Sequence, residues 1–268
     1  MDDEHFSPQD FVNVLSGASR LRSLSLHFVS FTPHPNDVGL PPPCGDRIVL
    51  PALTSFKYRG IIEYFDRFVV RIDAPRLGNI DITFLSPPMM DASQLGQFVE
   101  RIDMQTSATE AEIRISADSI SIFLQNSTTS TCLRLQIYLM RLDWRLSSMA
   151  QICDQISLFL FGVQHLIFMS HDSPSRLVDA NSEQWVQLVR LFTCARTLSI
   201  TGVLATGLLC ALRSADGGYT TDTTVLPALR ALCIWEHMPL DWPLFFFFFL
   251  NQFIFRGNRP WTQTGHST

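Results

Sequence analysis

The feature that most constrains the fold of this chain is a ten-residue phrase that occurs twice. Residues 49–58 read VLPALTSFKY, and residues 225–234 read VLPALRALCI. In both copies the sequence Leu-Pro-Ala-Leu leads into alternating large apolar residues. Because a single unit of this kind cannot bury its apolar face alone, its recurrence predicts that several units stack side by side.

Both copies end in the spacing L-x-x-ϕ-x-ϕ, where ϕ is a large apolar residue. This spacing is the strand register of a leucine-rich repeat. It recurs along the chain with middle apolar positions at 24, 56, 80, 166, 198 and 232. Residues 111–115 and 133–137 alternate with period two and fill the longest gap. We therefore expect an α/β fold: an irregular leucine-rich-repeat-like solenoid with a parallel sheet on one face and helices on the other.

Amphipathic stretches between these strands predict the helices. An i, i+3, i+4, i+7 apolar stripe marks residues 61–72, and Asp91 is expected to cap a helix over residues 92–102. The alternating run 119–124 closely follows residues 111–115, so we expect one β-hairpin inserted into the parallel stack. Further helices are expected from Ser7 and over 146–156, 182–192 and 205–213, and loops over 32–46, 171–182 and around Gly217.

The end of the chain differs from this pattern. We expect residues 1–240 to form the solenoid and residues 241–268 to be an atypical Phe-rich tail outside it. Residues 244–250 are five consecutive Phe between two Leu, and the whole apolar stretch covers residues 242–255. That stretch is shorter than the about 20 residues that a membrane-spanning helix needs. A translated intron or a shifted reading frame would explain such a tail.

Composition argues against several classes of protein. Of the 268 residues, 46% are hydrophobic and 17% are charged, which is typical of a folded chain. The net charge of −5 argues against a nucleic-acid partner, because phosphate contacts need a basic face. The six cysteines form no C-x-x-C pair, so we expect buried free thiols, with Cys132, Cys194 and Cys233 in or beside strands. With no signal-peptide pattern at the acidic N-terminus, we expect a cytoplasmic or nuclear protein that does not bind a membrane.

No arrangement of residues in the sequence predicts catalysis. Ser170, His171 and Asp172 are adjacent in sequence and so cannot form a triad, and there is no G-x-S-x-G elbow. The chain also lacks a phosphate-binding glycine loop, and its seven histidines lack metal-ligand spacing. We therefore expect no enzyme activity, no cofactor and no metal site.

Several phrases fall in an order that one protein family shares. LPALTSFKYRG at 50–60 is followed by RIDAPRLGNIDITF at 71–84, and LRSLSL at 21–26, DWRLSS at 143–148 and the Gln184-Trp185 helix start add to them. Over about residues 7–240 the chain resembles the F-box/leucine-rich-repeat-like proteins that are expanded in mushroom-forming fungi. The F-box of that family docks a Skp-type adaptor of a cullin-RING ubiquitin ligase, and its repeats are the expected substrate-binding region. No Leu-Pro-x-Glu helical start precedes Leu21, so we expect the F-box, and with it the adaptor, to be absent.

Repeats and resemblance together imply a protein–protein interaction scaffold, similar to the substrate-recognition region of an F-box protein, with an unknown protein partner. A second hypothesis is a truncated or misannotated fragment of such a gene with no independent function. On the scaffold hypothesis, strand residues between the apolar positions face the partner. The candidate partner-binding residues are Ser25, Lys57, Asp81, Ile167 and Ser199.

Overall fold

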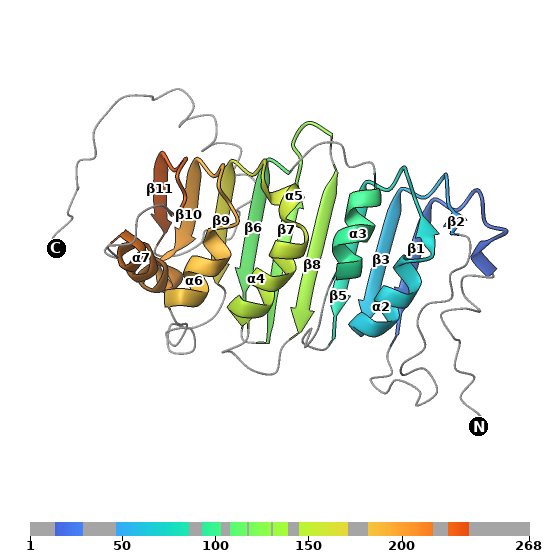
Figure 1. Cartoon of the computed structure of the whole chain (residues 1–268), viewed down its shortest axis with the longest axis horizontal. Coiled ribbons are helices and arrows are strands. Elements are labelled where there is room, and N and C mark those ends of the chain that lie inside the picture. The colour runs from blue at the N-terminus through green and yellow to red at the C-terminus, as the bar shows by residue number, and fades with distance from the viewer. Residues whose placement is uncertain are drawn as a thin grey trace.

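The protein is a mixed α/β structure built on one large sheet (Figure 1). The computed structural model describes residues 14–28, 47–85, 93–102, 108–116, 118–129, 131–138, 145–170, 182–216 and 225–235. The described helices lie side by side over one face of the sheet (Figure 1). The helix expected from Ser7, the loop 32–46, most of the loop 171–182, Gly217 and the tail 241–268 lie outside the described residues.

Nine strands form the main sheet and two short strands form a second one. The main sheet contains β1 (Ser23–His27), β3 (Ser55–Gly60), β5 (Asn79–Phe84), β6 (Glu110–Ile115), β7 (Ser119–Gln125), β8 (Cys132–Tyr138), β9 (His165–Ser170), β10 (Thr197–Thr201) and β11 (Ala231–Trp235). The second sheet pairs β2 (Ile48–Val49) with β4 (Ile72–Asp73). The helices are α2 (Ile62–Val69), α3 (Ser93–Arg101), α4 (Arg145–Gln155), α5 (Ser157–Leu160), α6 (Ser182–Val189) and α7 (Gly202–Asp216).

All six L-x-x-ϕ-x-ϕ segments form strands of the main sheet, as predicted. They pair in parallel, and their middle apolar residues stand opposite one another in two sets: Leu24, Phe56 and Ile80, then Leu166, Leu198 and Leu232. Successive residues of a strand point to opposite faces, so this register gathers the apolar residues on one side of the sheet. That side is the one the helices cover, and it forms the core.

The same turn leads into each of these strands. The residue that opens the register donates its backbone N–H to the carbonyl three residues earlier, as Leu53 does to Leu50 at 3.2 Å and Leu229 to Leu226 at 3.1 Å. Neighbouring units are then joined by a shared acceptor, the carbonyl just before a strand. It accepts two N–H groups from the next unit in the sheet, and this occurs at Arg22, Thr54, Thr109, Gln164 and Arg196. The two copies of the repeated phrase therefore share this turn. They differ at its first residue, because Leu226 has a φ of 56° and its counterpart Leu50 has no positive φ.

The middle of the sheet departs from simple stacking. The predicted hairpin is confirmed, because β6 and β7 pair in antiparallel fashion with Ile113 opposite Ile122. However, β7 also pairs with β8, so the three strands form a meander within the sheet. The spatial order is β1-β3-β5-β8-β7-β6-β9-β10-β11, which places the last strand of the meander beside β5 and the first beside β9. The outer strands of a meander run parallel to each other, so either one can continue a parallel stack.

The predicted helices at 61–72, 92–102, 146–156, 182–192 and 205–213 correspond to α2, α3, α4, α6 and α7. The predicted C-terminal end of the helix at 61–72 was wrong, because α2 ends at Val69 and does not reach Ile72. Ile72 instead pairs with Ile48 in the small second sheet. Its backbone hydrogen bonds therefore go to a strand, and the helix stops before it.

Aromatic rings fill the core near the first strands. Phe65 of α2 lies against Tyr58, Phe84 and Phe98, with ring centroids 5.2, 5.4 and 6.0 Å away. The Tyr58 hydroxyl donates to the carbonyl of Ile61 at 2.6 Å, so the polar end of this buried ring has a partner. Burial raises the pKa of Tyr58, which keeps the phenol neutral.

A close contact between α3 and α4 yields a stability prediction. A Cβ added to Gly96 would lie 2.5 Å from the carbonyl oxygen of Gln155, at the end of α4. Overpacking typically costs about 1–3 kcal/mol, and a contact this short with a backbone atom favours the upper end of that range. Alanine regains roughly 1 kcal/mol over glycine in helix propensity, so we expect Gly96→Ala to lower the free energy of unfolding by about 1–2 kcal/mol.

Urea denaturation followed by circular dichroism measures this effect. Gly17→Ala is the matched control, because nothing lies within 4 Å of a Cβ at that position. We expect the control to change stability by less than about 0.5 kcal/mol. Equal stabilities of the two variants would contradict the α3–α4 contact.

Candidate functional site

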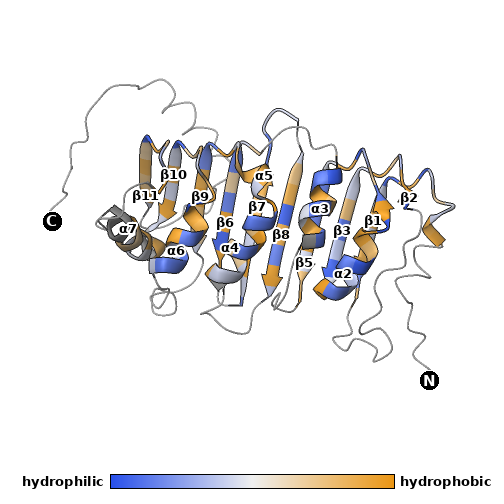
Figure 2. Cartoon of the chain, viewed as in Figure 1, coloured by the Kyte–Doolittle hydropathy of each residue, from blue (hydrophilic) through white to orange (hydrophobic). Residues whose placement is uncertain are grey.

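The face of the sheet opposite the helices, which we call the open face, carries the polar residues of the strands. Figure 2 shows the alternation directly, as hydrophilic and hydrophobic bands along β8. The strand register arranges the open-face residues in rows that cross the whole sheet. The middle row runs Ser25, Lys57, Asp81, Arg134, Phe123, Glu112, Ile167, Ser199 and Cys233.

The structure brings all five candidate residues together in this one row. Ser25 and Lys57 are exposed, and Asp81 and Ser199 are half-buried. The expectation for Ile167 was wrong, because that side chain is only 3% exposed and cannot meet a partner. Its cross-strand neighbour Glu112 and its strand neighbour Met169 flank it on the same face and are buried as well. The open face is therefore accessible over its first strands and closed around β6 and β9.

Four strands form the accessible half of the open face: β1, β3, β5 and β8. In it the Lys57 ammonium lies 3.4 Å from the Asp81 carboxylate, which links β3 to β5. The Arg59 guanidinium lies over the ring of Tyr138, 5.9 Å from its centroid. The accessible half is thus charged, and its side chains contact one another across strands.

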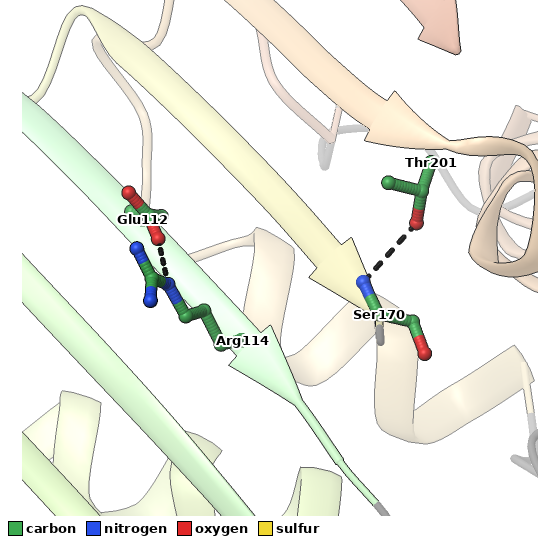
Figure 3. Close-up of polar contacts among 4 residues, drawn as sticks. All are labelled: Glu112, Arg114, Ser170 and Thr201. Atoms are coloured by element: carbon green, nitrogen blue, oxygen red, sulfur yellow. Dashed lines mark hydrogen bonds and ion pairs between the residues drawn. The ribbon is translucent and has the colours of Figure 1, made fainter. Parts of the chain in front are cut away.

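The part of the open face around β6 and β9, which we call the closed half, contains paired polar groups. Glu112 and Arg114 of β6 form an ion pair (Figure 3), which provides the buried carboxylate with a counter-charge. At the end of the neighbouring strand, the Ser170 backbone N–H donates to the Thr201 hydroxyl at 3.2 Å (Figure 3). The first contact lies within β6, and the second joins β9 to β10, so we assign both a structural role.

Glu110, His165 and Thr197 stand side by side in the row that precedes this ion pair. His165 Nδ1 lies 2.7 Å from the Thr197 hydroxyl oxygen. Burial and the nearby Glu112 raise the pKa of Glu110 to about 7. Burial and Arg196 lower the pKa of His165. Among the described residues the His165 ring bonds Thr197, and no ion pair joins it to Glu110, so the acid–imidazole contact of a catalytic triad is not formed in this set.

An apolar groove lies at the other end of the sheet. Its volume is about 550 Å³, and its lining is Leu229, Arg230, Ala231, Leu232 and Ile234. Ile234 continues the apolar row of the core but is 50% exposed. Ile234 lies on β11, which pairs with β10 alone among the strands that the structure describes.

Sequence reasoning missed Arg134, Gln136 and Tyr138, which complete the accessible half from β8. The signal was present, because Arg134 alternates with Leu133 and Leu135 as Lys57 does with its apolar neighbours. The predicted burial of the thiols was wrong for three of the cysteines. Cys132 and Cys233 are half-buried because their register places them on the open face, and Cys194, in the turn before β10, is half-buried too. Trp185, in contrast, packs in the core against Phe168 at 5.4 Å.

The row of Glu110 and His165 yields a prediction on pH. The folded-state pKa of Glu110, about 7, exceeds its ordinary value of 4.5, so the folded protein binds more protons between these values. Its contribution to stability therefore falls as the pH rises from about 4.5 to 7. The pKa of His165 is lowered, so its contribution falls as the pH drops below 6.5. The two effects oppose each other.

Urea denaturation between pH 5 and 8, with the variants Glu110→Gln and His165→Asn, separates the two contributions. We expect Glu110→Gln to gain stability relative to the natural chain as the pH rises, by roughly 1–2 kcal/mol after allowance for solvent screening. His165→Asn should instead gain relative stability as the pH falls. If the difference in stability from the natural chain is independent of pH for both variants, the raised pKa of Glu110 and the lowered pKa of His165 are contradicted.

Within the described ranges, no group of three or more His, Cys, Asp or Glu side chains could hold a metal ion. Of the helices that the structure describes, none has the length and apolar character needed to cross a membrane. Compared with family models, curated proteins and solved structures, the chain gives no match. The open face is thus the candidate site that the geometry itself supports.

Proposed function

We propose that this protein is a protein-interaction scaffold that binds its partner across the accessible half of the open face. The observation that carries the proposal is the single row in which Ser25, Lys57 and Asp81 stand beside Arg134. Their side chains project from adjacent strands of one sheet, so their spacing is set by backbone hydrogen bonds. A surface of this kind is pre-organised, which lowers the entropy cost of binding.

The shape of this surface favours a macromolecular partner. Adjacent strands lie about 4.8 Å apart, so β1, β3, β5 and β8 present a surface roughly 14 Å across between the outer strand axes. Small molecules are bound in concave pockets that bury most of their surface. A polar row on the face of a sheet instead offers contacts to an extended segment or a second protein surface.

The recurring turns support the repeat architecture within the proposal. In a leucine-rich-repeat-like solenoid, each unit contacts its neighbours through the same set of backbone bonds. The shared carbonyl acceptors at Thr54 and Arg196, in opposite halves of the sheet, follow that rule. The proposed solenoid places helices on one side and leaves the other side of the sheet for recognition.

The family resemblance extends the proposal to a class of partner. Residues 50–60 and 71–84, which carry much of that resemblance, build β3, β4 and β5 and so supply Lys57 and Asp81. By analogy with the substrate-recognition region of an F-box protein, the partner would be a ubiquitylation substrate. This part of the proposal rests on resemblance and has its own test.

Binding through the open face is tested by affinity purification with quantitative mass spectrometry. We expect the double variant Lys57→Ala/Arg134→Ala to recover the specific partner at least about tenfold less, which corresponds to roughly 1.4 kcal/mol. Arg20→Ala/Arg76→Ala removes two exposed cations outside the open face and should leave recovery unchanged. Equal recovery by both double variants would exclude the open face as the binding surface.

The ubiquitylation role is tested by the half-life of the captured partner. If the partner is a ubiquitylation substrate, the captured partner should carry ubiquitin chains, and its half-life should lengthen when the proteasome is inhibited. A captured partner without ubiquitin chains, with a half-life that does not respond to inhibition, would contradict this class of partner and leave the scaffold role standing.

A further inference from the structure

We propose that the accessible half of the open face binds an acidic, extended segment of the partner. This inference rests on the proposed function and adds the chemistry of the partner. The observations behind it are the charge of this half, the contacts of its one acid and the spacing of its cations.

The accessible half is basic although the chain as a whole is acidic. On its four strands the open face carries three cations, Lys57, Arg59 and Arg134, and one anion, Asp81. The sum is +2, whereas the net charge of the chain is −5. All three cations are exposed. A local charge opposite to that of the whole molecule favours a partner that is locally acidic.

Asp81 lies between two of the cations. It pairs with Lys57 at 3.4 Å on one side, and the register places it opposite Arg134 on the other. Its side chain is 28% exposed, against 52% for that of Lys57. The Asp81 carboxylate therefore restrains the Lys57 side chain, while the Lys57 ammonium stays accessible to a partner. The negative charge of Asp81 also cancels part of the positive charge of this half, so it weakens the attraction for a partner carboxylate.

The two arginines supply the geometry for carboxylates. A guanidinium group can bind a carboxylate through two parallel hydrogen bonds. Arg59 lies over the Tyr138 ring, so its side chain is already oriented when the partner arrives. The Arg59 side chain therefore loses less conformational entropy when the partner binds.

The spacing of the cations matches an extended segment. Lys57 and Arg59 are two residues apart on β3, about 6.6 Å, which is also the distance between alternate side chains of an extended chain. Arg134 lies two strands from Lys57, about 9.6 Å away. Acidic residues at alternate positions of an extended segment that runs along β3 can therefore meet Lys57 and Arg59. Arg134 stands to one side of that line, and Ser25, Asn79 and Gln136 offer neutral hydrogen bonds around it.

The same observations disfavour a nucleic acid. Affinity for a nucleic acid comes largely from neutralising many backbone phosphates with Lys and Arg. The accessible half has three cations, and one of them is paired with Asp81. Three positions suit a short run of carboxylates better than a phosphate backbone.

Fluorescence anisotropy with defined probes tests the inference. The probes are a labelled peptide in which Glu alternates with Ser, the same peptide with Lys in place of Glu, and a labelled oligothymidylate. We expect only the Glu peptide to bind well, and Lys57→Glu/Arg59→Glu/Arg134→Glu to weaken it at least about tenfold through like-charge repulsion. Arg20→Glu/Arg76→Glu/Arg190→Glu changes the net charge equally at exposed sites outside the open face and should keep the affinity within about twofold.

A single substitution adds a test with the opposite sign. Asp81→Asn removes the competing acid, so it should tighten binding of the Glu peptide by about threefold, within the range of exposed charge pairs. Tighter binding of the oligothymidylate than of the Glu peptide, or equal losses in the two triple variants, would overturn the inference. If the Glu peptide fails to bind while Lys57→Ala/Arg134→Ala still loses the captured partner, the acidic assignment is wrong and the proposed function stands. If neither effect is seen, both are wrong.

Discussion

The constraint on which this structure depends is the register between neighbouring strands. Each strand turns a set of apolar residues towards the helices, and a slip of one residue would turn that set away from them. The register is held at the start of the strands, where one carbonyl accepts two N–H groups from the neighbouring unit. Because the same register also aligns the residues of the opposite side, the burial of Phe56 and Ile80 decides where Lys57 and Asp81 stand. The open-face row is thus a consequence of forming the core.

The reversed order of the meander determines the charge of the accessible half. Because β8 lies beside β5, Arg134 becomes the cross-strand neighbour of Asp81. Had β6 occupied that position in the same register, Glu112 would have stood next to Asp81, and two acids would have faced each other. In the observed order Glu112 instead forms an ion pair with Arg114 of its own strand, in the closed half. Strand order therefore separates a basic, accessible region from a closed one.

The two halves of the sheet differ in how they use their polar groups. In the first half, polar side chains are exposed, and their contacts, such as the Lys57–Asp81 pair, contribute little to stability in water. In the second half, the polar groups are more buried, and their burial perturbs the pKa values of Glu110 and His165 in opposite directions. One half is therefore suited to contacts with another molecule, and the other to holding the sheet together.

The sequence by itself determined the local structure: the strands from the apolar spacing, most helices from their stripes, and the β6–β7 hairpin from its two alternating runs. It also placed Ser25, Lys57, Asp81 and Ser199 on the correct face, because alternation with buried neighbours decides the face. Only the tertiary structure decided which strands are neighbours, and so brought Arg134 beside Asp81 and enclosed Ile167. The physical reason is that the side-chain pattern of a strand specifies which face is buried, whereas strand order follows from pairing between segments that are distant in sequence.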